Sequence, residues 1–212
     1  MRSGGARHDA ILFDFDGVLV DSEPVHFACW REILRPFGIP LQWADYAAHC
    51  IGVSDRAMID TLVRLAGRPE DFEVIYARYP EKKALFRERM LADPPMPAST
   101  KQLLEELKGL PLAVVTSSGR AEVEPILAKL GVLPRLAAAI YGDQVKRLKP
   151  DPEPYLMAAA RLGCKAPLVV EDSEAGCASG RAAGFEVLRV RRPDEVAAQV
   201  RQALRSFPTP AP

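Results

Sequence analysis

Acidic, hydroxyl and lysine side chains occur at four separated points of this chain, each after an apolar run or in a loop. Residues 14–17 read Asp-Phe-Asp-Gly, residues 116–119 read Thr-Ser-Ser-Gly, residues 171–173 read Glu-Asp-Ser, and Lys149 lies in the loop sequence RLKPDP. Acidic, hydroxyl and lysine groups together are the inventory that metal-assisted phosphoryl transfer requires. The sequence points to this chemistry, provided that the fold brings the four segments together.

The first segment lies where a site is expected. Asp14 and Asp16 follow the run AILF, which is typical of a parallel strand buried on both faces, and Gly17 allows an immediate turn. Both carboxylates are therefore expected at the carboxyl end of a strand, where open α/β sheets form their ligand crevice. A calcium loop is excluded, because residues 18–20 are apolar where further oxygen ligands are needed.

Each segment also has a purely structural explanation. The acidic stretch from Asp14 to Gly17 can be a turn with Asx hydrogen bonds, and hydroxyl or acidic residues before a helix are commonly caps. A loop lysine such as Lys149 is usually solvated. These explanations are individually good, but they do not account for the four segments occurring together.

The chain after residue 97 alternates between strand and helix patterns. This alternation predicts right-handed crossovers and an α/β fold with a parallel sheet flanked by helices. The predicted strands are 112–116, 137–142, 167–170 and 186–190, and the predicted helices are 99–108, 120–130, 151–162, 174–183 and 193–205.

Proline-marked breaks at 21–24 and 92–97 bracket a segment that reads almost wholly helical. We predict an α/β core formed by residues 1–20 and 95–212, with a helical domain at 21–94 inserted after the first strand. The expected helices of this domain are 24–36, 42–50, 54–66 and 70–91.

Composition narrows the class of partner. Lys plus Arg and Asp plus Glu number 28 each, so nothing favours binding to nucleic acid or to an anionic membrane, and a small molecule is expected instead. No apolar run approaches membrane-spanning length, and the start MRSGGARHD has no apolar signal core, which predicts a cytoplasmic protein. A monomer is compatible with the sequence, which does not predict the oligomeric state. The cysteines are expected to be small buried hydrophobic residues: Cys29, Cys50, Cys164 and Cys177.

The four segments resemble, in order, the four motifs of the haloacid dehalogenase superfamily: Asp14–Gly17, Thr116–Ser117, Lys149–Pro150 and Glu171–Asp172. The resemblance covers about 10–23 and 98–192. It implies a Rossmann-like core, and the helical insertion resembles the cap that this superfamily places after its first motif.

The resemblance also implies roles for the two aspartates. Asp14 corresponds to a nucleophile that forms an aspartyl-phosphate, which divides one difficult hydrolysis into two steps. Asp16 corresponds to a general acid that protonates the leaving alkoxide and then, as a base, activates water. Dehalogenases of this superfamily lack the second aspartate, so Asp16 favours phosphate esters as substrates. Relatives that cleave phosphonates use a cap lysine, and the first predicted cap helix contains none.

A magnesium site follows from the same resemblance. The Asp14 and Asp172 carboxylates and the Asp16 backbone carbonyl are expected to hold Mg2+, with Glu171 as an indirect or water-mediated partner. Charge favours a metal independently: four carboxylates crowded at one sheet edge repel one another unless cations are present, and Lys149 supplies only one positive charge. We therefore predict strict dependence on Mg2+.

The remaining motif residues are expected to bind the substrate. Thr116 and the Ser117 backbone amide would bind phosphoryl oxygens, and Lys149 would offset negative charge on the nucleophile and phosphate. In the cap, His26 and Arg56 are candidate substrate contacts, since the segments DSEPVHFACW and GVSDR resemble β-phosphoglucomutases and related sugar phosphatases.

The predicted function is a magnesium-dependent phosphatase acting on a small sugar phosphate or sugar-acid phosphate. The stretch RLKPDP resembles bacterial sugar-acid phosphatases such as 6-phosphogluconate phosphatase. A sugar phosphomutase is the alternative; Ile51 stands where mutases carry a lysine, and Arg56 comes one place late. A catalytically idle binding protein of the same fold is a further alternative, which the intact motifs disfavour.

Overall fold

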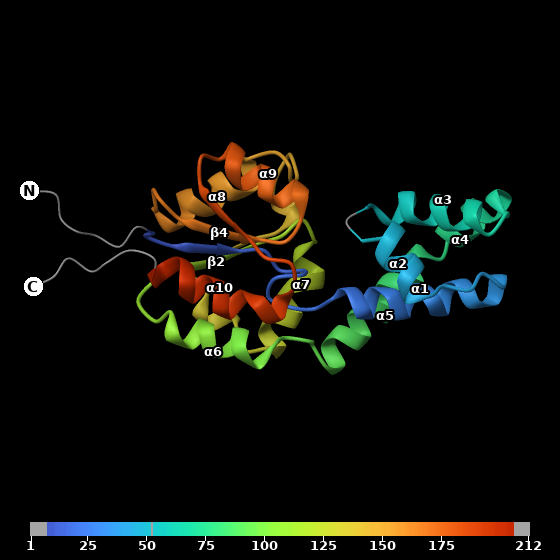
Figure 1. Cartoon of the computed structure of the whole chain (residues 1–212), viewed down its shortest axis with the longest axis horizontal. Coiled ribbons are helices and arrows are strands. Elements are labelled where there is room, and N and C mark those ends of the chain that lie inside the picture. The colour runs from blue at the N-terminus through green and yellow to red at the C-terminus, as the bar shows by residue number, and fades with distance from the viewer. Residues whose placement is uncertain (1–7, 52, 206–212) are drawn as a thin grey trace, which may run out of the picture. The chain divides into compact units, whose positions relative to one another are not determined.

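The computed structural model describes residues 8–51 and 53–205 (Figure 1). The start of the chain and Gly52, which belongs to the segment compared with mutases, lie outside these residues. The chain divides into two units, one formed by Met1–Asp21 with Pro94–Pro212 and the other by Ser22–Asp93. We call them the α/β unit and the helical unit and describe each by itself.

The α/β unit is built on a five-stranded parallel sheet in the order β3-β2-β1-β4-β5. Its strands are β1 (Ile11–Phe13), β2 (Leu112–Val115), β3 (Ala138–Ile140), β4 (Leu168–Glu171) and β5 (Glu186–Arg189). Phe13 pairs with Val114 on one side and Val170 on the other, so the three central strands end almost level. This register places whatever follows β1, β2 and β4 at one edge of the sheet.

Helices cover both faces of this sheet. They are α6 (Ala98–Glu106), α7 (Arg120–Lys129), α8 (Glu153–Leu162), α9 (Glu174–Ala182) and α10 (Pro193–Arg205). Figure 1 shows α8 and α9 on one face and α6 and α10 on the other. Because both faces are covered, the three central strands are mainly apolar, and β1, β2 and β4 are buried along their whole length. The predicted fold class is confirmed.

One apolar cluster shows how the sheet and α8 hold each other. Leu12, Ala113 and Val169 point to the same face from three neighbouring strands and pack with Tyr155 and Ala158 of α8. All five side chains are fully buried. Burial of a side chain the size of Leu or Val contributes about 1.5–3 kcal/mol, so this layer fixes α8 firmly against the strands.

The helical unit contains helices only, among its described residues. They are α1 (Glu23–Leu34), α2 (Trp43–His49), α3 (Asp55–Leu65), α4 (Phe72–Tyr76) and α5 (Tyr79–Ala92). Apolar side chains from all of them except α5 form its main buried cluster, with Trp30, Ile59 and Ile75 among its fully buried members. Of the helices in the described part of the whole chain, none has the length and apolar character needed to cross a bilayer.

The prediction of one helix over 70–91 is wrong. The segment begins with a 3₁₀ turn at Pro69–Asp71, α4 ends at Tyr76, and α5 starts at Tyr79. Pro80 explains the break, since it lacks an N–H for the carbonyl of Tyr76 and its ring would clash there, whereas in the first turn of α5 neither property costs stability.

Two smaller predictions also need correction. The helix expected at 24–36 ends at Leu34 and continues as a 3₁₀ turn, Arg35–Phe37. Cys29, Cys50 and Cys177 are buried as predicted, but Cys164 is partly exposed because it follows the end of α8.

Candidate active site

The level ends of the central strands bring the first, second and fourth motifs together. Asp14 follows β1, Thr116 follows β2, and Glu171 is the last residue of β4. The backbone continues the pairing past the strands, since the Asp14 N–H donates to the carbonyl of Val170 and the Thr116 N–H donates to that of Ile140. These side chains are therefore held by the sheet itself rather than by free loops.

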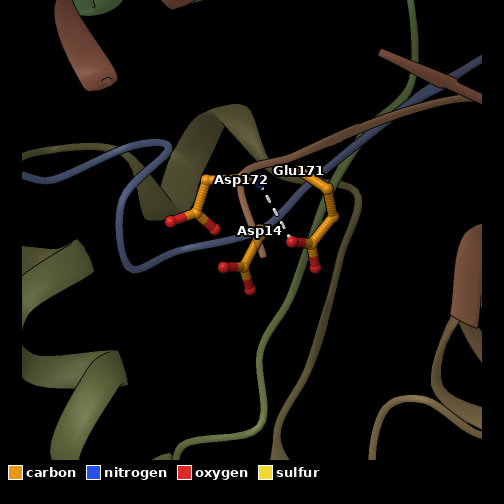
Figure 2. A group of neighbouring side chains, drawn as sticks. All are labelled: Asp14, Glu171 and Asp172. Atoms are coloured by element: carbon orange, nitrogen blue, oxygen red, sulfur yellow. Dashed lines mark hydrogen bonds between the residues drawn. The ribbon is translucent and has the colours of Figure 1, made fainter. Parts of the chain in front are cut away.

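Three carboxylates share one small space at this edge. Asp14, Glu171 and Asp172 each offer an oxygen within 4.8 Å of the others (Figure 2). Gly17 makes room for them: it has a φ of +71°, and a Cβ at that position would lie 2.0 Å from Asp172 Oδ2. The turn after the acidic pair therefore requires glycine both for its backbone conformation and for its close approach to a carboxylate.

Burial and repulsion from neighbouring carboxylates make Asp14 and Asp172 hard to ionise. Burial raises the pKa of Asp14 well above its ordinary value, Lys149 opposes the shift, and Glu171 and Asp172 add to it. Burial and the neighbouring Glu171 raise the pKa of Asp172 to about 7. An additional cation would relieve this repulsion, so the donor set fits a hard divalent ion such as Mg2+.

Lys149 is enclosed by the acidic cluster. Its Nζ lies 2.7 Å from Asp14 Oδ1 and 2.5 Å from Glu171 Oε1, and it donates to the carbonyl of Val115 at 2.9 Å. Burial alone would lower the pKa of this ammonium, but the charges of Asp14 and Glu171 raise it above the ordinary value. The third motif thus places a fixed positive charge directly on the first aspartate.

Glu171 is fully buried and saturated with donors. Oε1 accepts from Lys149 and from the Tyr155 hydroxyl at 2.8 Å, while Oε2 accepts from the Asp172 N–H and from the N–H and hydroxyl of Ser173. Sequence reasoning missed Tyr155 and Ser173. The local sequence gives no signal for Tyr155, because it occupies one of the apolar positions of α8. Ser173 does have a local signal, since it is the N-cap of α9 and accepts a hydrogen bond from the Gly176 N–H.

Asp16 faces the loop that follows β2. The Ser118 hydroxyl lies 3.4 Å from Asp16 Oδ2, and the Ser118 N–H donates to Thr116 Oγ1 at 3.0 Å. Thr116 is buried and Ser117 is exposed. Ser118 is a further residue that sequence reasoning missed, although it stands in the same Thr-Ser-Ser-Gly run.

The two predicted substrate contacts from the insertion, His26 and Arg56, lie in the helical unit. The His26 ring stacks on Phe86 with centroids 3.9 Å apart, and its Nδ1 is 2.8 Å from Lys82 Nζ. Arg56 is exposed, lies over the rings of Phe72 and Tyr76, and is 3.6 Å from a Glu73 oxygen. The structure thus places His26 inside a packed cluster and Arg56 on the surface of its unit.

The His26 cluster contains a buried lysine that the sequence did not reveal. The Lys82 side chain is 4% exposed, its Nζ lies 3.3 Å from Asp55 Oδ1, and the Trp30 indole donates to the same oxygen at 2.8 Å. Burial, and then the charge of Lys82, lowers the pKa of His26 to about 3, so the imidazole is neutral. No lysine lies in α1, but one packs against α1 from α5.

A family model for haloacid dehalogenase-like hydrolases matches residues 8–184, which include all four motifs. The chain belongs to this family. Among its curated relatives in the family, the phosphorylated carbohydrates phosphatase of Thermotoga maritima is 33% identical over 183 residues, covering 84% of this chain and 82% of the relative. The fructose-1-phosphate phosphatase YqaB of Escherichia coli is 32% identical over 188 residues, and the alignment covers 87% of this chain and 97% of the relative.

Solved structures of the family agree with this assignment. The crystal structure of a HAD family hydrolase from Deinococcus radiodurans, with bound phosphate and sodium, has a TM-score of 0.74 to this chain. It is 28% identical, and the alignment covers 93% of this chain and 89% of that one. The predicted family and the prediction of an enzyme are therefore confirmed.

Proposed function

We propose that this protein is a magnesium-dependent phosphatase that hydrolyses a small phosphorylated carbohydrate, either a sugar phosphate or a sugar-acid phosphate. The observation that carries the proposal is the buried Lys149 ammonium, fixed 2.7 Å from the Asp14 carboxylate at the sheet edge that also bears Thr116 and Asp172. The curated relatives named for phosphorylated carbohydrates support the substrate class.

In the first half-reaction a carboxylate oxygen of Asp14 attacks phosphorus and the bond from phosphorus to the ester oxygen breaks. Lys149 holds Oδ1 and so orients the carboxylate for attack. Asp16 gives its proton to the departing alkoxide. The products are the free alcohol and an aspartyl-phosphate.

In the second half-reaction Asp16, now ionised, takes a proton from water. The resulting hydroxide attacks phosphorus, the bond from phosphorus to the Asp14 oxygen breaks, and inorganic phosphate leaves. Thr116 and the Ser117 N–H are the proposed donors to the phosphoryl oxygens in both steps, and among the described residues that N–H has no hydrogen-bond partner.

The residues proposed to hold Mg2+ are Asp14 and Asp172, through their carboxylates, and Asp16, through its backbone carbonyl. A bound Mg2+ neutralises charge on the phosphoryl group and on the crowded carboxylates. Glu171 has both oxygens occupied by protein donors, which favours a positioning role on Lys149 over direct ligation.

The contributions of His26 and Arg56 to substrate binding stay predictions. The accessible guanidinium of Arg56 supports the idea for that residue, and Arg56→Ala should raise the KM for a sugar phosphate more than that for p-nitrophenyl phosphate. The cytoplasmic location and the independence from nucleic acid and membranes are likewise predictions from composition.

The experiment is hydrolysis of p-nitrophenyl phosphate and of a panel of sugar, sugar-acid and nucleotide monophosphates, with and without Mg2+. We expect Mg2+-dependent release of phosphate, with the highest kcat/KM among the carbohydrate esters. Asp14→Asn should be inactive, whereas Asp9→Asn is a matched control, since Asp9 caps backbone N–H groups of residues 165 and 166. Isomerisation of a β-hexose 1-phosphate without matching phosphate release would favour the mutase instead.

A further inference from the structure

The turn that follows β3 holds the loop that follows β2. The Gly142 N–H donates to the Ser118 carbonyl at 2.9 Å, and the Arg120 N–H donates to Asp143 Oδ2 at 2.9 Å. These two bonds extend the pairing that begins where Thr116 donates to Ile140. Neither Gly142 nor Asp143 belongs to any of the four motifs, and yet both touch the segment proposed to bind the phosphoryl group.

Gly142 allows a very close approach between the two segments. A Cβ at this position would lie 2.0 Å from the Ser117 carbonyl oxygen and 3.1 Å from Leu148 Cδ2. Because the first of these neighbours is backbone, any side chain would have to displace the loop that carries Ser117. The turn at Gly142 therefore packs directly against the backbone of Ser117 and restricts its position.

Asp143 supplies a cap that the sequence of α7 lacks. The residue before this helix is Gly119, which has no side chain with which to accept the first backbone N–H groups. The Asp143 carboxylate accepts the N–H of Arg120 from another segment of the chain. The Arg120 guanidinium is engaged with a different carboxylate, since it donates to both oxygens of Glu124 at 2.8 and 3.0 Å.

We propose that Asp143 is a positioning residue for phosphoryl binding, acting through the backbone of residues 117–120. Its bond to Arg120 fixes one end of the loop, the Thr116 bond to Ile140 fixes the other, and between them the Ser117 N–H is held in place. The inference rests on the proposed phosphatase function. It adds Asp143, a residue outside the four motifs, to the residues on which affinity for the phosphoryl group depends.

The experiment compares Asp143→Ala with Asp143→Asn, measuring kcat, the KM for p-nitrophenyl phosphate and the Ki of inorganic phosphate. A hydrogen bond to a charged group contributes enough for its loss to cost about tenfold or more, so Asp143→Ala should lower kcat/KM by about that factor and raise KM and Ki together. Asp143→Asn keeps an acceptor oxygen and should stay within about threefold of the wild type. A partly unfolded preparation would lower kcat alone.

Asp9→Ala is the matched control, because Asp9 makes the same kind of carboxylate contact to two backbone N–H groups elsewhere in the α/β unit. It should lower the melting temperature and leave KM and Ki unchanged. Gly142→Ala is a second variant, which displaces the loop by a different route and should also raise KM and Ki.

The inference is overturned if Asp143→Ala leaves KM and Ki within twofold of the wild type, or if Asp143→Asn loses as much as Asp143→Ala. If Asp143→Ala does not fold, an unchanged KM and Ki in Gly142→Ala overturns it. Calorimetric binding of inorganic phosphate in the presence of Mg2+ separates this failure from the failure of the proposed function. Absence of hydrolysis by the wild type would contradict the proposed function. Weaker phosphate binding by Asp143→Ala would still support the positioning role of Asp143.

Discussion

Each unit of this protein buries one lysine among charged partners, and the two lysines are balanced differently. In the α/β unit, Lys149 contacts Asp14 and Glu171, with Asp172 close by. In the helical unit, Lys82 contacts one carboxylate, Asp55, together with a neutral imidazole and the faces of aromatic rings. The first cluster has three carboxylates for one ammonium, and the second has one for one.

This difference in charge separates a cluster that favours an additional cation from one whose charges are already paired. Around Lys149, burial raises the pKa values of Asp14 and Asp172 and the neighbouring carboxylates add to the shift, so the cluster is stabilised by taking up another cation. Around Lys82 the charges already balance, and burial keeps His26 neutral. A buried lysine therefore does not by itself indicate a catalytic site. The balance of charge around the lysine is the more informative feature.

The largest expected effect is the removal of the metal. Chelation should reduce hydrolysis to background, because the three carboxylates at the sheet edge repel a phosphate dianion unless a cation is bound. Addition of Mg2+ should restore activity and raise the melting temperature of the wild type, but should raise that of Asp172→Asn less. Turnover that persists after exhaustive chelation would contradict the claim that the Lys149 cluster, unlike the Lys82 cluster, needs a further cation.

The next largest effect concerns Lys149. Lys149→Met should lower kcat/KM by about 100-fold to 1,000-fold, because it removes a fixed charge from the proposed nucleophile, Asp14, and from the phosphoryl group. It should also destabilise the protein by about 3–5 kcal/mol, since Asp14 and Glu171 stay buried without their partner. Steady-state kinetics and urea unfolding measure the two effects. Activity within tenfold of the wild type would contradict the assigned role.

Lys82→Met is the matched variant in the helical unit. It leaves Asp55 without its cation, so we expect a loss of about 3 kcal/mol of stability, again by urea unfolding. The kcat for p-nitrophenyl phosphate and its dependence on Mg2+ should change by less than about threefold, since the cluster is complete in itself. A loss of kcat comparable with that of Lys149→Met would show that both clusters serve the chemistry.

The smallest expected effect is a dependence of stability on pH that comes from His26. Its pKa of about 3 in the folded protein lies below the ordinary 6.5, so protons bind preferentially to the unfolded chain. The resulting stabilisation is complete above about pH 6.5 and is lost as the pH falls towards 3. Unfolding between pH 7 and pH 4.5 should show a steeper loss for the wild type than for His26→Gln, and parallel curves would refute this.

The sequence predicted those parts of the molecule that leave a local signal. Apolar runs that end in Asp14, Thr116 and Glu171 mark strand ends, and the order of parallel strands brings strand ends together whatever the loops between them do. Pro80 is a local signal for the break between α4 and α5, and the prediction of one helix over 70–91 does not use it.

Contacts between distant segments left no such signal. Lys82 reaches His26 across 56 residues of chain, and Lys149 reaches Asp14 across 135. Only the second pair could be anticipated, because both members lie in recognisable motifs. Tyr155 and Asp143 carry no pattern of their own, since a hydroxyl or a carboxylate becomes a partner only once the fold has placed an acceptor or a donor beside it.

The central claim is that Asp14 is the nucleophile, and trapping the covalent intermediate tests it most directly. Enzyme mixed with a good phosphate ester and Mg2+, then quenched in acid within the first turnover, should carry one phosphoryl group on the peptide that contains Asp14. The modification should be removed by hydroxylamine, as an acyl phosphate is, and should be absent from Asp14→Asn. An active enzyme with no phosphorylated Asp14, or with the phosphoryl group on another residue, would contradict the account.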